Sequence, residues 1–473
     1  MKGLNILAFD LGASSGRAVL GRFNGKKLSI EEVHRFPNQP VKLGDTLYWD
    51  FPRLFFELKQ GIRKAKQIAP ELTSVGIDTW GVDFGLLDKK GRLLNNPVHY
   101  RDSRNIGVME KAFEVVPKRE IFNLTGLQFL PFNTAYQLYA LKLAGGHELD
   151  SAGQMLMLPD LFVYFFSGAR TGEFTDCSTS QLLSPKTGDW NKELIRKLGL
   201  PQRIFPEIIP AGTVLGGFRK ELQDELGLKG TRLIAVAEHD TASAVASVPA
   251  KGKGWAYISA GTWFLLGAEV GSPVITDQSY AHHFANEGGA EGRWRLLKNI
   301  PGFWFLEQCK LCFELKLGRE VSYPELMKET EKARPGLALI DVDAPDFLNP
   351  PNMVTAIQNY CRERGLKIPQ TRGEILRVAF ESIIHRCKTV LSQLEEVMGK
   401  DVDRVHMVGG GARNRLFCKW LAKALKREVI TGPEEATSLG NLAMQLIALE
   451  ELGSLEEARE LIRNSVKLCR LFP

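Results

Sequence analysis

Short apolar runs separated by turns of small residues fill the first part of the chain. The first run ends in Asp10, a second begins after Arg17, and a third covers residues 27–36, beyond the turn dipeptide Asn24-Gly25. Short runs joined by an Asn-Gly turn are typical of antiparallel strands. The pattern therefore predicts a strand meander, with a loop rich in glycine and serine between its first two strands.

The periodicity changes from that of strands to that of helices after residue 50. Residues 50–67 have the spacing of an amphipathic helix, whereas residues 74–81 and 82–88 have the pattern of two strands. Apolar runs alternate with helical stretches from there on, which is typical of layered α/β proteins. Residues 106–230 are rich in helical pattern, and we expect them to form an insertion in the first domain.

The opening pattern returns after residue 254. Residues 255–270 again contain a strand, a turn with Gly261-Thr262 and a second strand, which indicates two related halves. Because 473 residues are too many for one core, we expect two domains, residues 1–247 and 248–473. Glycine, proline and lysine between residues 248 and 254 favour an exposed hinge at this boundary.

The last third of the chain brings a third glycine cluster. The pattern predicts a helix over residues 366–399 and a strand over residues 402–408, which runs into Gly409-Gly410-Gly411. A helix over residues 414–426 follows, and a last helical region begins near residue 435. A triple glycine at a strand end lets a ligand such as adenosine approach the backbone without a side-chain clash.

Composition narrows the class of protein. The chain is 44% hydrophobic and 25% charged, with a formal net charge of +6, as in an ordinary globular protein. We find no long basic run, no apolar span of about eighteen residues and no signal-peptide pattern, so we expect a cytoplasmic protein that binds neither nucleic acid nor membrane. Seven cysteines without framework spacing predict reduced thiols, and the lone CxxC at Cys309 and Cys312 predicts no zinc site.

Residues 10–17, DLGASSGR, are suited to holding phosphate. Gly12, Ser14, Ser15 and Gly16 offer backbone N–H groups with little side-chain obstruction. Walker and dinucleotide loops open a helix, whereas this loop leads into a strand, so it fits neither type. An ordinary hairpin with a polar tip is the alternative. Together with the turn in the second half and the triple glycine, the loop has the order expected of a nucleotide-binding cleft.

This order of motifs resembles the actin-like ATPase superfamily and, within it, the FGGY carbohydrate kinases. The motifs that carry the resemblance are DLGASSGR at 10–17, IDTWGVDF at 77–84, YRDSR at 100–104, QFLPFNT at 128–134, HDTASAV at 239–245, NEGGAEGR at 286–293 and LKN at 297–299. They extend over nearly the whole chain and are most similar to the branch that phosphorylates L-rhamnulose. Residues 137–140 and Tyr100 depart from the wider family in the direction of that branch.

The resemblance implies an α/β fold with two ribonuclease H-like domains of the actin and hexokinase type and a cleft between them. The N-terminal domain would bind sugar and the C-terminal domain nucleotide. The implied reaction, part of rhamnose catabolism, transfers the γ-phosphoryl group of ATP to the C1 hydroxyl of L-rhamnulose, with Mg²⁺ as cofactor. The partner would be a small-molecule ketose, and the protein a monomer or small homo-oligomer.

The resemblance also assigns roles to individual residues. Asp240 would be the general base, and the amides of the helix that begins there should keep it ionised. Asp10 would hold Mg²⁺ through water, because Mg²⁺ keeps several waters and takes few carboxylates. The implied sugar contacts are Gly81, His239, Asp240, Thr241 and Asn299. The implied ATP contacts are Ala13, Ser14, Ser15, Gly16, Arg17, Thr262, Glu307 and Gly411.

Alternatives remain at several of these positions. Glu307 stands where the family usually has glutamine, and Gln308 beside it could make the nucleotide contact instead. Asp240 could be a plain helix N-cap and His239 a buried structural histidine. Weaker candidates for the sugar pocket are Asp78, Trp80, Asp102 and Arg104.

Two other functions compete with L-rhamnulose phosphorylation. A kinase for another ketose, such as L-fuculose or L-xylulose, would share every mechanistic feature and differ in its hydroxyl contacts. A scaffold or chaperone ATPase of the same superfamily would bind ATP at the glycine loops but would need no aspartate directed at a sugar.

Overall fold

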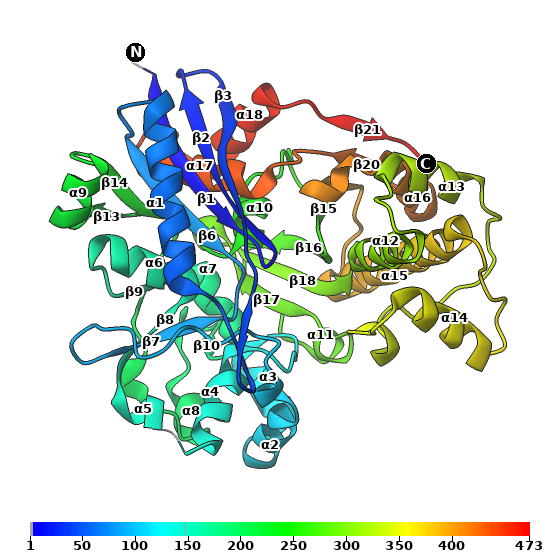
Figure 1. Cartoon of the computed structure of the whole chain (residues 1–473), viewed down its shortest axis with the longest axis horizontal. Coiled ribbons are helices and arrows are strands. Elements are labelled where there is room, and N and C mark those ends of the chain that lie inside the picture. Colours follow the sequence, from blue (N-terminus) through cyan, green and yellow to red (C-terminus); the bar gives the residue numbers. More distant parts are fainter. Residues whose placement is uncertain (1–2, 146) are drawn as a thin grey trace. The chain divides into compact units, whose positions relative to one another are not determined.

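The computed structural model describes residues 3–145 and 147–473 (Figure 1). Met1 and Lys2, with which the first expected domain begins, lie outside the described residues. The chain forms two compact units. The first runs up to Lys251 and includes Glu269–Leu296 and Ala436–Val466; the second comprises Gly252–Ala268, Leu297–Glu435 and Lys467–Pro473. The expected division into domains at residues 247 and 248 stays a prediction.

A six-stranded mixed sheet is the centre of the first unit. Its order is β13 (Thr213–Gly217), β14 (Arg232–Ala235), β6 (Ser74–Thr79), β1 (Leu4–Leu11), β2 (Ser15–Phe23) and β3 (Leu28–Pro37). The antiparallel meander predicted from the sequence is confirmed in β1, β2 and β3. β6 runs parallel to β1 and to β14, so the carboxyl ends of these three strands meet at one edge.

Helices cover both faces of this sheet. Leu7 and Phe9 of β1 pack in one core with α1 (Phe51–Ile68) and α6 (Leu158–Ser167). Ile6 and Ala8 pack in another core with α17 (Ala436–Ala448) and α18 (Leu455–Ser465). Figure 1 shows α1 on one side of the strands and α17 and α18 on the other. Because both faces are buried, residues 6–9 of β1 are continuously apolar rather than alternating.

The insertion expected over residues 106–230 is helix-rich and lies in the first unit. Its helices are α2 (Val108–Val115), α3 (Lys118–Thr125), α4 (Thr134–Leu143), α5 (His147–Ser151), α6, α7 (Phe174–Cys177), α8 (Lys192–Lys197) and α9 (Lys220–Leu226). Small pairs of strands accompany them: β7 (Phe84–Asp88) with β8 (Ala152–Met157), β9 (Thr171–Glu173) with β12 (Glu207–Ile209), and β10 (Leu183–Ser184) with β11 (Asp189–Trp190). A further hairpin, β4 (Val41–Leu43) and β5 (Thr46–Tyr48), precedes α1.

A seven-stranded sheet contains the second predicted hairpin. Its order is β17 (Ala285–Gly288), β18 (Trp294–Pro301), β16 (Trp263–Val270), β15 (Trp255–Ala260), β19 (Arg404–Val408), β20 (Glu428–Thr431) and β21 (Cys469–Leu471). β15 and β16 are antiparallel, and β19 runs parallel to β15 and β20. The chain passes from one unit to the other within β16 and again within β18.

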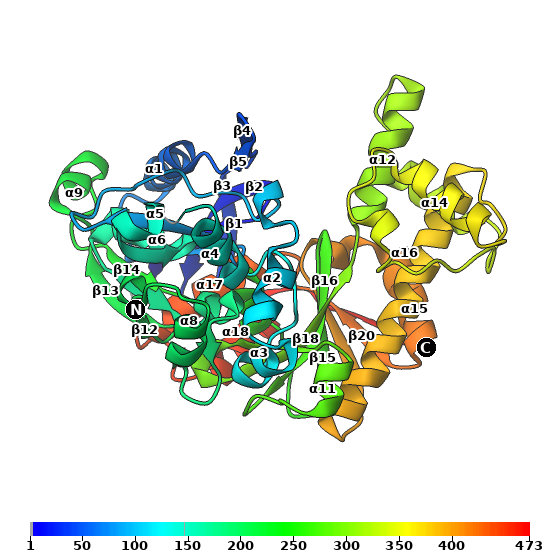
Figure 2. The ribbon, with the colours of Figure 1, turned by 90° about the horizontal axis from the view of Figure 1, so that it is seen from below.

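The second unit is completed by helices. They are α12 (Trp304–Leu317), α13 (Tyr323–Lys332), α14 (Met353–Glu363), α15 (Arg372–Met398) and α16 (Arg415–Leu425). α12 packs against both α14 and α15, as Figure 2 shows. Within the described part of the chain, none of the helices combines the length and hydrophobicity that a membrane crossing demands. All seven cysteines are free.

The helix predicted over residues 366–399 begins later than its pattern indicates. α15 begins at Arg372 after the N-cap Thr371, whose side chain accepts the N–H of Glu374 while the Glu374 side chain accepts the N–H of Thr371. This capping box is a start signal that the apolar spacing alone does not show. Pro369 lies just before it and disfavours helix at the preceding residue. The prediction was therefore wrong for residues 366–371.

Candidate active site

The loop between β1 and β2 is fixed by hydrogen bonds. The N–H of Gly12 donates to the carbonyl of Ser15 at 2.9 Å. Asn38, which is buried just after β3, donates its Nδ2 to the Gly12 carbonyl (2.9 Å) and its backbone N–H to the Ser14 carbonyl (3.0 Å). The predicted ATP contacts from Ala13 to Arg17 lie in this turn and in the first residues of β2.

Gly16 has a packing role in addition to its predicted role in binding. A Cβ at this position would overlap the buried ring of Phe36. At Gly12 the nearest atom to such a Cβ is the Ser15 carbonyl oxygen, at 3.5 Å, which is an ordinary contact. Of these two glycines, Gly12 can therefore take a methyl group without repacking of the hairpin, and Gly16 cannot.

Asp10 is the predicted magnesium ligand, and α17 contributes to its surroundings. Arg17, its partner across the hairpin, donates Nη2 to Asp10 Oδ2 at 2.8 Å, and the Ser438 hydroxyl donates to the same oxygen at 3.0 Å. Asp78 is the neighbour of Asp10 on β6 and accepts from Asn441 Nδ2 at 2.6 Å. Burial raises the pKa of Asp78 well above its ordinary range, and the charge of Asp10 adds to this effect.

Asp240 is the first residue of α10 (Asp240–Ala246), and His239 is the N-cap residue, so the aspartate is not itself the cap. Thr241 Oγ1 donates to Asp240 Oδ1 at 3.1 Å, and His239 Nε2 lies 3.4 Å from the same oxygen. The Asp240 side chain is 29% exposed. Burial raises its pKa, against the direction expected from a helix N-terminus; the charge of Asp10 also raises it, whereas His239 and Thr241 lower it. Both of these side-chain contacts lie on Oδ1.

The backbone before Asp240 is anchored by a buried glutamate. Glu173 Oε2 accepts from the N–H of Glu238 at 3.1 Å and from the N–H of Thr175 at 2.9 Å. Thr175 Oγ1 in turn accepts from the N–H of His239 at 3.2 Å. Burial raises the pKa of Glu173 to about 7. These contacts fix where α10 begins. No local pattern indicates them, because 65 residues separate Glu173 from Glu238.

Four buried carboxyl groups lie in this part of the first unit and were not anticipated from the sequence. They are Asp160, Glu173, Asp176 and Glu238, each no more than 2% exposed. Burial raises the pKa of Asp160, Asp176 and Glu238 well above the ordinary range, and repulsion within the group adds to it. Within the described residues, both carboxylate oxygens of Asp176 lack a hydrogen-bond partner, whereas the carboxyl groups of Asp160 and Glu238 hydrogen-bond to each other.

The loop after β6 contains the predicted sugar contact Gly81 and a strained valine. A Cβ on Gly81 would lie 2.9 Å from the Thr179 side chain. Val82 has a φ of 71°, a conformation that is rare for a β-branched residue. Its N–H donates to Thr179 Oγ1 (3.0 Å), and its carbonyl accepts from Thr134 Oγ1 (2.7 Å) and Gln137 Nε2 (3.1 Å). Strain held in place by surrounding contacts is typical of functional sites.

Trp80 and Asp102, two weaker candidates for the sugar pocket, make contacts that stabilise the fold. Trp80 is a core residue, 7% exposed, and donates Nε1 to Asp83 Oδ2 at 2.9 Å. Trp49 Nε1 donates to the same oxygen at 2.6 Å, and burial raises the pKa of Asp83 to about 6. Asp102 is buried, caps a short turn through the N–H of Arg104 and accepts the N–H of Leu47 at 2.6 Å. Trp80 therefore packs in the core, and Asp102 organises its loop.

Two predicted nucleotide contacts of the second unit lie together. Thr262 is in the turn between β15 and β16, and its carbonyl accepts the N–H of Gly302 at 3.1 Å. Glu307, in the first turn of α12, has its Oε2 3.5 Å from Thr262 Oγ1. Glu307 rather than Gln308 therefore faces this turn.

Gly411 lies in a short 3₁₀ turn, η6 (Gly410–Arg413), which follows β19. A Cβ at Gly411 would come within 2.6 Å of the Ala260 Cβ and 2.9 Å of the Phe303 ring. The glycine is therefore required for the close approach of the β19 end to β15. Asn299 lies on β18 in the second unit, whereas the other predicted sugar contacts lie in the first unit.

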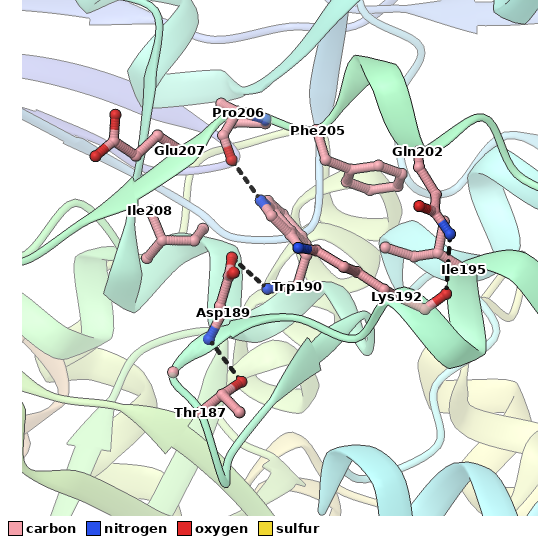
Figure 3. Close-up of a pocket in the computed structure, with 11 residues that line it drawn as sticks. Thr187, Asp189, Trp190, Lys192, Ile195, Gln202, Phe205, Pro206, Glu207 and Ile208 are labelled. Carbon is pink, nitrogen blue, oxygen red and sulfur yellow. Dashed lines mark hydrogen bonds between the residues drawn. The ribbon is translucent and has the colours of Figure 1, made fainter.

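A pocket of about 510 Å³ lies elsewhere in the first unit (Figure 3). Its wall contains Trp190, whose ring nitrogen donates to the Pro206 carbonyl at 2.7 Å, and Phe205, whose ring centroid is 4.9 Å from that of Trp190. Among the described residues that line it, none was predicted to contact sugar or nucleotide. The predicted chemistry thus lies at the strand ends and not in this pocket.

The sheet order and the paired hairpins fit the fold expected of a carbohydrate kinase. Residues 5–247 match the N-terminal domain of the FGGY family of carbohydrate kinases, and residues 256–449 match its C-terminal domain. The chain belongs to this family. The fold class predicted from the sequence is confirmed.

Curated relatives and solved structures agree with this family. The chain is 40% identical over 469 residues to the protein of Bacteroides thetaiotaomicron named Rhamnulokinase, covering 99% of this chain and 96% of the relative. It is 38% identical to the Rhamnulokinase of Bacillus subtilis, covering 98% and 95%. Xylulose kinase from Lactobacillus acidophilus matches with a TM-score of 0.82 at 16% identity, over 99% of this chain and 94% of that one. Plasmodium falciparum glycerol kinase with ADP has a TM-score of 0.77 at 17% identity, over 98% and 94%.

Proposed function

We propose that the chain phosphorylates L-rhamnulose on its C1 hydroxyl, with ATP as phosphoryl donor, to give L-rhamnulose 1-phosphate and ADP. The observation that carries the proposal is the identity of 38–40% to proteins named Rhamnulokinase, over nearly the whole length of both chains. The geometry around Asp240 supports it, because a partly exposed carboxylate at the start of a helix can accept a proton from a substrate hydroxyl.

In the proposed reaction, Asp240 Oδ2 takes the proton of the C1 hydroxyl as the hydroxyl oxygen attacks the γ-phosphorus. The bond from the γ-phosphorus to the β,γ-bridging oxygen breaks, and ADP leaves. Phosphoryl transfer of this kind depends mainly on positioning and charge stabilisation. Thr241 and His239 hold Oδ1, so the orientation of Oδ2 is set before the sugar arrives. Gly81 and Asn299 would make the remaining sugar contacts.

ATP would use loops of both units. In the first unit, the amides of residues 13–16 and the Arg17 guanidinium would bind phosphate, because Asn38 fixes the loop through its hydrogen bonds to Gly12 and Ser14. In the second unit, Thr262, Glu307 and Gly411 would contact the nucleotide.

The residues at Asp10 fit a hydrated magnesium ion. Arg17 and Ser438 both donate to Oδ2, so Oδ1 is the oxygen that would hold a water of the ion. One carboxylate with water and phosphate oxygens is a donor set that Mg²⁺ commonly takes. When bound, the ion would neutralise charge on the phosphate groups.

A coupled ADP-release assay tests the proposal. Purified protein is given ATP, Mg²⁺ and, in turn, L-rhamnulose, L-fuculose, L-xylulose and no sugar. We expect kcat/KM to be at least tenfold higher for L-rhamnulose than for the other ketoses, a difference of about 1.4 kcal/mol. Preference for another ketose would replace the substrate assignment, and ADP release that no sugar stimulates would contradict the kinase.

A further inference from the structure

We infer that Arg295 is a positioning residue, which holds His239 as a neutral imidazole with its proton on Nε2 and so directs that proton toward Asp240. The inference rests on the proposed function for the role of Asp240 as base. It concerns a residue of β18 that belongs to the first unit and does not itself contact the proposed substrate.

The Arg295 side chain is completely buried and its contacts are specific. Nε donates to the Gly288 carbonyl at 2.8 Å, and Nη2 lies 3.0 Å from His239 Nδ1. The same Nη2 lies 3.1 Å from Glu287 Oε2. A buried guanidinium needs an opposite charge, and Glu287, whose side chain is 8% exposed, supplies it.

The chemistry of the guanidinium decides where the proton of His239 lies. Arginine carries five N–H donors and no acceptor, so at 3.0 Å from Nη2 the ring nitrogen Nδ1 must accept. The neutral ring then has its proton on Nε2, 3.4 Å from Asp240 Oδ1. The competing arrangement would place a proton on Nδ1 for Glu287 Oε2, which is 3.4 Å away and thus farther than Nη2.

The charges around the His239 ring connect its contact with Arg295 to the basicity of Asp240. The charged groups that face the His239 ring are Asp240 from α10, Glu287 from β17 and Arg295 from β18. The two carboxylates favour an imidazolium, and the guanidinium opposes it. An imidazolium beside Asp240 would lower the basicity of the carboxylate. By opposing the imidazolium, Arg295 therefore leaves the basicity of the Asp240 carboxylate undiminished.

The test combines NMR with a pH profile, using Arg295→Met, Glu287→Gln and the control Arg459→Met. Arg459 is an equally buried arginine of the first unit, which pairs with Glu269 at 2.7 Å and donates to the Val245 carbonyl at the far end of α10. In ¹⁵N-histidine-labelled protein, assigned with His239→Gln, we expect the Nε2–H form of His239 in the wild type and in Arg459→Met. In Arg295→Met at pH 6 we expect a protonated Nδ1.

The pH dependence of kcat should shift in opposite directions in the variants Arg295→Met and Glu287→Gln. For Arg295→Met, we expect the fall in kcat that accompanies protonation of the His239 ring to shift to higher pH by about one unit, which is about tenfold at pH 6, with a much smaller change at pH 8. For Glu287→Gln, which keeps the arginine, the same fall in kcat should shift to lower pH. If Arg295→Met does not fold, Glu287→Gln alone tests the inference. A merely structural role of Arg295 would not produce pH-profile shifts of opposite sign in the two variants.

Different results would overturn the role of Arg295 and the proposed kinase function. A wild-type His239 with its proton on Nδ1, or an Arg295→Met variant whose tautomer and pH profile match those of Arg459→Met, would overturn the role of Arg295 even if the protein phosphorylates L-rhamnulose. If no ketose is phosphorylated, the proposed function fails, and the NMR spectra still decide the tautomer.

Discussion

At the scale of single residues, the proposed reaction depends most on Asp240. We expect Asp240→Asn to lower kcat by about 10² to 10⁴, the usual contribution of a positioned general base. Asparagine keeps the volume and can still accept from Thr241 Oγ1. It cannot take the hydroxyl proton. Kinetics with L-rhamnulose and ATP measure the loss, and calorimetric binding of both substrates should change by no more than a few-fold.

Asp102→Asn serves as a control for that substitution. Asp102 organises a loop through backbone N–H groups and is not expected to take part in proton transfer. The control should change the sugar KM or the stability and leave kcat within a few-fold. If Asp240→Asn turned over L-rhamnulose as fast as this control, Asp240 would not be the base.

The phosphate loop offers a second comparison of single residues. Gly12→Ala adds a methyl group at ordinary contact distance from Ser15, so the protein should stay as stable as the wild type while the KM for ATP rises several-fold. Gly16→Ala should instead lower stability by about 1–3 kcal/mol, because its methyl group would overlap the Phe36 ring.

Thermal unfolding and ATP titration of the two variants separate packing from binding. A Gly12→Ala variant that binds ATP normally would remove this loop from the nucleotide site. A Gly16→Ala variant as stable as the wild type would mean that Phe36 moves aside easily. The packing role of Gly16 could not be read from the sequence, because Phe36 lies on the next strand and its ring direction depends on the register of β2 and β3.

At the scale of elements, α10 and α17 pack unusually closely. A Cβ on Gly440 would overlap the carbonyl of Ser243, so the two helix backbones are nearly in contact. The same α17 supplies Ser438 to Asp10 and Asn441 to Asp78. The position of this helix thus sets the surroundings of the acidic residues on β1 and β6 as well as the packing of α10.

We therefore expect Gly440→Ala to reduce both stability and kcat. Alanine in place of glycine inside an exposed helix gains about 1 kcal/mol, so a loss here can come only from the clash. The loss should be about 1–3 kcal/mol, the usual cost of overpacking. Differential scanning calorimetry and kcat measure it. Gly271→Ala, at a position with nothing within 4 Å of the added Cβ, should change neither, and equal stability of the two variants would contradict the close packing.

The strands that carry the site were largely predictable, whereas the contacts between distant elements were not. The two hairpins follow from short apolar runs and small-residue turns, which are local signals. The contacts of Ser438 with Asp10 and of Arg295 with His239 join residues 428 and 56 positions apart, and no local pattern encodes them. Arg295 did carry one signal, a charged residue inside an apolar strand, which required a buried partner.

At the scale of the whole molecule, the buried carboxyl groups make stability depend on pH. Burial raises the pKa of Glu173 to about 7 and raises that of Asp176 well above its ordinary range. In the unfolded chain these groups have pKa values of about 4. Between these values the folded protein binds more protons than the unfolded chain, so stability falls as pH rises from about 4 through 7. Below pH 4 both states are protonated and the penalty disappears.

Asp176→Asn should remove part of this penalty, because the amide has the same shape and does not ionise. Neither carboxylate oxygen of Asp176 has a hydrogen-bond partner within the described residues, and its carboxylate neighbours can accept from an amide N–H. We expect the Tm to rise by roughly 2 °C or more at pH 8 and to change much less at pH 4.5. Thermal scans across this range make the measurement.

Glu325→Gln is a control for Asp176→Asn, because it should change stability at pH 8 in the opposite direction. Arg319 and Arg372 lower the pKa of Glu325 to about 2, so its contribution to stability is present above the unfolded value and is lost as pH falls toward 2. The glutamine variant should therefore be less stable than the wild type at pH 8, by an amount that salt reduces because the pair is exposed. If Asp176→Asn instead lowered the Tm at pH 8, the buried carboxylate would have a partner that stabilises its charge, and the acidic group would support the fold rather than strain it.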